Sequence, residues 1–153
     1  MQLWRYSSKI ISSLGIIICA AACSSNDIDY TPPSGNTETA ITHYSFGKMV
    51  IDGHPYESDL AVLPGGEVCR WSFGPNHEIS PDNLNGFVSD QVTTIIIGSG
   101  YAGNAHLTAS ARDMVAIWKS KGLTVHVVPS SKAVILFNAS PKKGLLAFFH
   151  LNC

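Results

Sequence analysis

Apolar and polar residues after residue 40 alternate in a pattern that begins as β structure. Asp52-Gly53 interrupts an apolar stretch, and this dipeptide is typical of a two-residue hairpin turn. Residues 60–63 and 68–71 predict two further strands on either side of a Pro-Gly-Gly break. The pattern therefore indicates an N-terminal β-hairpin region.

The second half of the chain alternates strands with helices. We expect strands at residues 93–97, 123–128 and 145–150. We expect helices at residues 108–121 and 130–138, and a short one that starts at residue 80 and ends near residues 87–90. Residues 93–97 are apolar on both faces, as in a central strand that helices cover. Thr108 and Gly122 supply the start and the stop of the helix with the clearest apolar periodicity, and Ser130 is expected to cap the next one. This order predicts an α/β fold in which at least part of the sheet is parallel.

The first residues have the pattern of an export signal. Arg5 and Lys9 precede an apolar run over residues 10–22. The run is shorter than the roughly 20 apolar residues that a membrane-spanning helix needs. We therefore interpret it as the apolar part of a signal peptide.

Three alanines stand directly before Cys23, as in the lipobox of bacterial lipoproteins. Small side chains allow the peptidase to approach the backbone, and the thiol receives the diacylglycerol. We therefore predict a lipoprotein signal peptide over residues 1–22 and a lipid on Cys23, with the membrane as partner. An ordinary cleaved signal peptide and a mitochondrial presequence are the alternatives. Ser24 and Ser25 follow without an Asp, which favours the periplasmic face of the outer membrane in a Gram-negative cell envelope.

Residues 23–40 are polar and offer little to bury, so we expect them to form a lipid-anchored flexible tether. A flexible chain of this length spans about 20 to 25 Å, enough to hold a domain clear of lipid headgroups. One domain then covers residues 41–153, a size that can bury its own core.

Composition narrows the classes of function. Charged residues make up 14% of the 153 residues, with 10 Lys+Arg against 11 Asp+Glu, and the sequence has no basic patch. Because binding to a phosphate backbone needs such a patch, nucleic acid is not expected as a partner. The apolar fraction of 45% excludes a disordered chain.

Several short motifs follow one another in a specific order and spacing. They are YSFGK at residues 44–48, LPGG at 63–66 with Trp71 downstream, IIGSG at 96–100, residues 133–138, and HLNC at 150–153. In these motifs residues 41–153 resemble the Mth938-like domain family, a family of unknown function that includes an adipogenesis-associated protein and a mitochondrial complex I assembly factor. The resemblance implies a three-layer fold with a mixed central sheet and helices packed on it, and it implies no catalytic mechanism.

A glycine-rich turn follows the expected central strand. Gly98, Ser99, Gly100 and Tyr101 lie at the C-terminal end of this strand, where such sheets bind ligands, so they form a candidate small-ligand or anion pocket. Residues 98–103 also fit the dinucleotide fingerprint, but the helix begins too late and the ribose-binding acid is missing. We expect no cofactor, and a structural turn is the alternative to the pocket.

Cys69 and Cys153 are the cysteines that remain after the leader and an acylated Cys23, and an oxidising compartment favours a disulfide between them. Two buried thiols are the alternative. His150 and Cys153 have a spacing compatible with metal ligands. Cys69 and His77 could complete the set, but no motif brings them together, so we expect no metal site. A cysteine–histidine nucleophile is not expected either.

These observations favour a membrane-anchored exported lipoprotein with a non-catalytic domain that binds a protein partner or a small ligand. An enzyme that acts on a small molecule in the crevice near residues 98–101 is the alternative. The sequence shows no ordered Ser-His-Asp set, paired acids or phosphate loop in its support.

Overall fold

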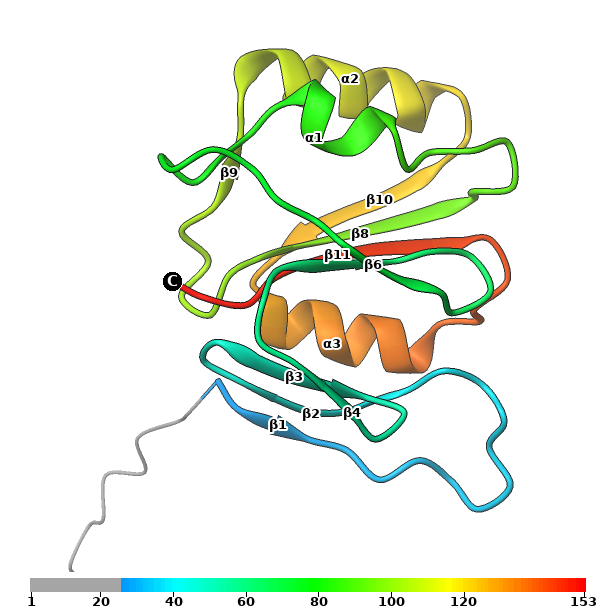
Figure 1. Cartoon of the computed structure of the whole chain (residues 1–153). Coiled ribbons are helices and arrows are strands. Elements are labelled where there is room, and N and C mark those ends of the chain that lie inside the picture. Colours follow the sequence, from blue (N-terminus) through cyan, green and yellow to red (C-terminus); the bar gives the residue numbers. More distant parts are fainter. Residues whose placement is uncertain (1–25) are drawn as a thin grey trace, which may run out of the picture.

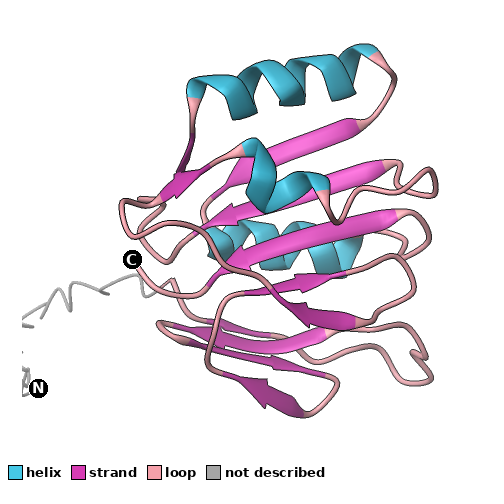
Figure 2. Cartoon of the chain, turned by 45° about the horizontal axis from the view of Figure 1, so that its top comes forward, coloured by secondary structure: helices cyan, strands magenta, loops and turns pink. Residues whose placement is uncertain are grey.

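The computed structural model describes residues 26–153, which form a layered α/β domain (Figure 1). Helices α1 (Pro81–Asn85) and α2 (Ala109–Ser120) cover one face of a central sheet, and helix α3 (Ser130–Ala139) covers the other (Figures 1 and 2). A second sheet packs against α3 and shares a core with it. The predicted signal peptide and Cys23 lie outside the described residues.

The central sheet has the strand order β10-β8-β11-β5-β6. Its strands are β5 (Leu60–Val62), β6 (Val68–Arg70), β8 (Thr94–Ser99), β10 (Thr124–Val128) and β11 (Leu145–His150). β10 and β11 pair in parallel with β8, whereas β5 pairs antiparallel with β11 and with β6. The sheet is therefore mixed, which confirms the predicted fold class.

β8 and β11 are buried on both faces because each contributes to two cores. Successive side chains of a strand point to opposite faces of its sheet. Ile97 and Phe148 lie in the core beneath α1 and α2. Their neighbours Ile96 and Phe149 lie in the core shared with α3 and the second sheet. The continuous apolar runs in the sequence follow from this double packing.

The second sheet is the predicted β-hairpin region and has the antiparallel order β1-β2-β3-β4. Its strands are β1 (Ile28–Asp29), β2 (Ile41–Ser45), β3 (Lys48–Ile51) and β4 (His54–Tyr56). Asp52 and Gly53 have φ angles of 49° and 81° between β3 and β4. Two successive positive φ angles are typical of a two-residue hairpin turn, so the predicted turn is confirmed.

Residues 26–40 differ from the expected flexible tether. β1 pairs with β2, Tyr30 N donates to Thr42 O at 3.0 Å, and Ala40 is buried. Asn26 donates two hydrogen bonds to Tyr101, one to the hydroxyl at 3.2 Å and one to the carbonyl oxygen at 2.8 Å. This segment is held mainly by backbone hydrogen bonds, which cannot be predicted from its polar composition. The ordered domain therefore begins before residue 41.

Helix α2 has the predicted limits. Thr108 Oγ1 accepts a hydrogen bond from Ala111 N at 3.2 Å, which caps the first turn. Gly122 follows the helix with a φ of 93°, as expected for a glycine that ends a helix.

The other two helices differ from the prediction at their ends. α1 ends at Asn85 instead of near residues 87–90, because Gly86 follows and Phe87 turns to pack against Phe148. Ser130 is the first residue of α3 and does not cap it, since Pro129 occupies the cap position. None of the helices within residues 26–153 is both long and apolar enough to cross a membrane.

The double-core arrangement can be tested at Phe148. Its ring is 0% exposed and lies 5.1 Å from the Trp71 ring and 5.4 Å from the Phe87 ring, between centroids. Phe148→Ala should lower the free energy of unfolding by about 3–5 kcal/mol in urea denaturation, because it leaves a cavity. The control Ile117→Ala, at a side chain 52% exposed on α2, should change it by less than about 1 kcal/mol. Similar losses in the two variants would contradict the packing described.

Candidate functional site

The C-terminal ends of β8 and β11 lie side by side, since Ser99 and His150 are register partners. After β11 the chain continues across the end of β8, where Tyr101 N donates to Asn152 O at 3.1 Å. Ligands of parallel sheets commonly bind beyond such strand ends. Here residues 152–153 of the same chain occupy the space beyond the end of β8.

Gly100 shows how closely these segments pack. It has a φ of 102°, and a Cβ at this position would lie 2.6 Å from Asn152 O and 2.7 Å from Cys153 O. Such distances are too short for carbon and oxygen, so only glycine fits. The crevice predicted beside Gly100 is thus filled by residues 152–153, and the glycine is required by this packing.

The other predicted pocket residues are also engaged with the protein itself. Gly98 and Ser99 are the last residues of β8, and Ser99 Oγ donates to Val128 O at 3.1 Å. Tyr101 is half-buried, and its ring lies 5.7 Å from the Phe46 ring. The sequence located the end of the strand correctly, but the structure gives these four residues packing roles.

Ser130 connects the two strand ends. Its hydroxyl donates to His150 O at 2.7 Å and accepts from Gly100 N at 2.9 Å, and the residue is fully buried. The side chain expected to cap a helix therefore fixes the turn after β8 against the last residue of β11.

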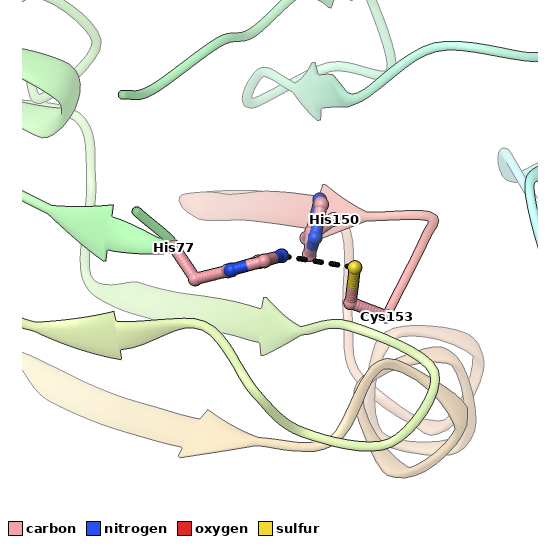
Figure 3. Close-up of side chains that lie close together, drawn as sticks. All are labelled: His77, His150 and Cys153. Carbon is pink, nitrogen blue, oxygen red and sulfur yellow. Dashed lines mark hydrogen bonds between the residues drawn. The ribbon is translucent and has the colours of Figure 1, made fainter. Parts of the chain in front are cut away.

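His77, His150 and Cys153 point toward one another at this end of the sheet (Figure 3). One nitrogen or sulfur atom from each residue lies within 4.8 Å of the others. His77 Nε2 is 2.9 Å from Cys153 Sγ. The structure thus brings together residues that the sequence left apart.

Two short strands hold His77 in place. β7 (Glu78–Ile79) pairs in parallel with β9 (His106–Leu107), and His106 N donates to His77 O at 2.8 Å. His77 has a φ of 56°, a left-handed conformation that is uncommon outside glycine. This backbone geometry directs the imidazole toward Cys153.

Asp59, directly before β5, orients His150. Its Oδ2 lies 2.8 Å from His150 Nδ1, and its Oδ1 accepts from Leu151 N at 2.9 Å. Because Nδ1–H donates a hydrogen bond to the carboxylate, Nε2 of the neutral ring keeps its lone pair. His150 is 7% exposed, and its Nε2 is buried without a hydrogen-bond partner among the described residues. Phe73 packs its ring 4.9 Å from that of His150.

The predicted disulfide between Cys69 and Cys153 is not formed, since both thiols are free within residues 26–153. Cys69 of β6 is the register partner of Ala61 of β5, and Ala61 is in turn the register partner of Phe148 of β11. Two strand spacings of about 4.8 Å already exceed the Cα separation of about 7 Å that a disulfide allows. Burial raises the pKa of the Cys69 thiol above its ordinary value.

The cluster of His77, His150 and Cys153 offers two imidazole nitrogens and one sulfur, a set that suits a soft or borderline metal ion. Sequence reasoning considered these three residues and expected no metal site, and it did not single out Asp59. The contacts join residues 76 and 91 positions apart. No local motif carries that information.

The packing of residues 152–153 can be tested by two matched glycine substitutions. Gly100→Ala adds a methyl group against two carbonyl oxygens, whereas Gly122→Ala adds it in open space at a similar positive φ. Gly122→Ala should cost about 1–2 kcal/mol of unfolding free energy through backbone strain alone. Gly100→Ala should cost about 1–3 kcal/mol more because of the clash, as measured by urea denaturation. Equal costs would mean that residues 152–153 do not pack on Gly100.

Solved structures of the same fold come from several organisms. A conserved hypothetical protein from Pyrococcus horikoshii is 22% identical with a TM-score of 0.63, over 74% of this chain and 98% of that chain. An outer membrane protein from Bartonella henselae is 15% identical with a TM-score of 0.59, over 76% and 97%. A Mth938-like domain from Bordetella pertussis is 16% identical with a TM-score of 0.55, over 80% and 91%. At these identities the similarity establishes the fold alone.

No curated protein sequence matches the chain. The model of a family described as "Protein of unknown function (DUF498/DUF598)" matches residues 41–148, which is well over half of the sequence. Together with the Mth938-like neighbour in the structural comparison, this match confirms the resemblance found in the sequence. The chain belongs to the DUF498/DUF598 family of Mth938-like domains.

Proposed function

We propose that the protein is an exported lipoprotein, anchored through Cys23, whose domain is a non-catalytic binding module held at the membrane surface. The observation that carries the proposal is the AAAC junction, followed within three residues by the docking of Asn26 onto the domain. The ligand would be bound at the strand ends where His77, His150 and Cys153 converge.

The distance from the lipid to the domain is short in this proposal. Cys23 and Asn26 are three residues apart, and a fully extended chain covers at most about 11 Å over three residues. Asn26 is hydrogen-bonded to Tyr101, so the domain would rest close to the lipid headgroups. The reach of 20 to 25 Å expected for a flexible tether does not apply to a segment that packs on the domain.

The surface next to Asn26 suits such a position. Phe46, at the turn between β2 and β3, is 60% exposed, and its ring packs edge-on against Tyr101. Lys48 is exposed beside it. Aromatic and basic side chains are favoured at the membrane–water interface. Asp27 lies on the same surface, so the proposed contact depends on the anchor and on Phe46 more than on charge.

The arrangement of the histidines supports binding over catalysis. A nucleophile–base–acid set needs one histidine that contacts both the thiol and the carboxylate. Here His77 contacts Cys153 and a different histidine, His150, contacts Asp59. The crevice near Gly100, where an enzyme would place a small substrate, is filled by the protein's own backbone.

The outer membrane is the proposed location in a Gram-negative cell. Ser24 and Ser25 after Cys23 favour it, and one protein of the same fold, from Bartonella henselae, is described as an outer membrane protein.

Acylation of Cys23 is tested by growth with a labelled fatty acid and mass spectrometry of the mature N-terminus. Label should enter the native chain and Cys19→Ser but not Cys23→Ser, because Cys19 follows bulky isoleucines and lacks the small residues of the junction. An unmodified Cys23 in the native chain would refute the anchor.

The orientation on the membrane is tested by tryptophan fluorescence in vesicles that contain brominated lipids. Phe46→Trp in the anchored protein should be quenched more strongly than Ile117→Trp, since Ile117 is exposed on α2, whereas Phe46 lies beside the docked N-terminal segment. Equal quenching would show that the domain does not hold one face toward the bilayer.

A further inference from the structure

The buried Nε2 of His150 is the least satisfied atom of the cluster. A buried polar atom without a partner costs free energy unless something pairs with it. Asp59 holds the proton on Nδ1, so Nε2 is the ring nitrogen with a free lone pair, which can only accept a hydrogen bond or coordinate. One ligand atom each of His77, His150 and Cys153 lies within 4.8 Å of the others, and His77 Nε2 contacts Cys153 Sγ.

The separations of these atoms are close to those of a metal shell. In a tetrahedral zinc site the bond lengths place two nitrogens about 3.4 Å apart and a nitrogen and a sulfur about 3.6 Å apart. The observed separations begin at 2.9 Å and do not exceed 4.8 Å. Shifts of about 1 Å would bring the three atoms to the separations of a zinc site. His77 and Cys153 are half-buried and lie outside helices and long strands, so their segments can make such shifts.

We propose that His77 Nε2, His150 Nε2 and Cys153 Sγ bind a thiolate-preferring transition-metal ion, Zn²⁺ or Cu⁺. This inference rests on the proposed binding function and names its ligand. On binding, the Cys153 thiol releases its proton to water, the hydrogen bond between Cys153 and His77 is lost, and a sulfur–metal bond forms. Sulfur and imidazole ligands favour these ions over Mg²⁺ and Ca²⁺, which prefer oxygen.

Asp59 is a positioning residue in this site. Metal-bound histidines commonly donate their other ring N–H to a carboxylate, which fixes the tautomer and raises the basicity of the ligand nitrogen. Asp59 makes this contact at 2.8 Å and also holds Leu151 N, one residue beyond the ligand. The hydrogen bond between Asp59 and Nδ1 of His150 is thus already formed, while Nε2 of the same ring has no partner among the described residues.

The test is a metal titration of the full chain purified in detergent. Co²⁺ serves as a spectroscopic substitute for Zn²⁺, because thiolate ligation gives a charge-transfer absorption. Zn²⁺ and Cu⁺ affinities are measured separately by competition with a chromophoric chelator for each ion, and the tighter arm identifies the ion. We expect one ion per chain, with a Kd of about 1 μM or lower.

The variants remove ligands at half-buried positions. His77→Asn keeps a residue that tolerates a positive φ, and Cys153→Ser is nearly isosteric. Each should weaken binding at least about 100-fold, and Cys153→Ser should also abolish the Co²⁺ charge-transfer absorption. The matched controls Cys69→Ser and His54→Ala, on β6 and β4, should bind as the native chain does. Native-like binding by Cys153→Ser, or no binding by the native chain at micromolar metal, would overturn the site.

Asp59→Asn separates positioning from mere support of the fold. It should weaken the metal affinity about 10- to 100-fold at a temperature where the variant is folded, while the Co²⁺ charge-transfer absorption is retained. Unchanged affinity would overturn the positioning role. The outcome for the site is independent of the anchor: an unmodified Cys23 with a bound ion refutes only the anchor, and an acylated chain without an ion refutes only the site.

Discussion

β11 is the strand of the central sheet at which parallel pairing changes to antiparallel pairing, and the rest of the domain is arranged around it. Every residue of β11 is buried, so both of its faces must be covered. The parallel side requires crossover connections, which α2 and α3 provide. The antiparallel side brings β5, and with it Asp59, next to the end of β11. His150 ends the strand, and its imidazole can be buried there because its Nδ1–H donates a hydrogen bond to Asp59.

Much of the fold could be predicted because its signals are local. The apolar run at residues 93–97, the Asp52-Gly53 turn and the Thr108 cap each depend on a few neighbouring residues, and all three are found in the structure. The order of the strands is a different matter. The sequence alone did not place β11 between β8 and β5, because that order depends on packing between distant segments. Strand β1 was not predicted either, because it is held in place by backbone pairing with β2 and not by apolar side chains.

The candidate site shows the same division. Residues 98–101 were located correctly at the end of a central strand, yet whether they face a ligand depends on the path of residues 151–153 after β11. His150 and Cys153 drew attention through their spacing, whereas His77 and Asp59 had no local signal at all. The proposed Cys69–Cys153 pairing failed for a related reason: β5 lies between β6 and β11, a fact of strand order.

The long sequence separations within the cluster also have a kinetic consequence. The contact of His77 with Cys153 spans 76 residues, and that of His150 with Asp59 spans 91. Closing such long loops is slow compared with forming helices and hairpins, so we expect these contacts to form late in folding. A chain that is synthesised from its N-terminus cannot assemble the cluster until β11 has been made and has joined the sheet. The cluster therefore stays incomplete in every form that lacks β11, and its thiol and imidazoles come together only in the complete domain.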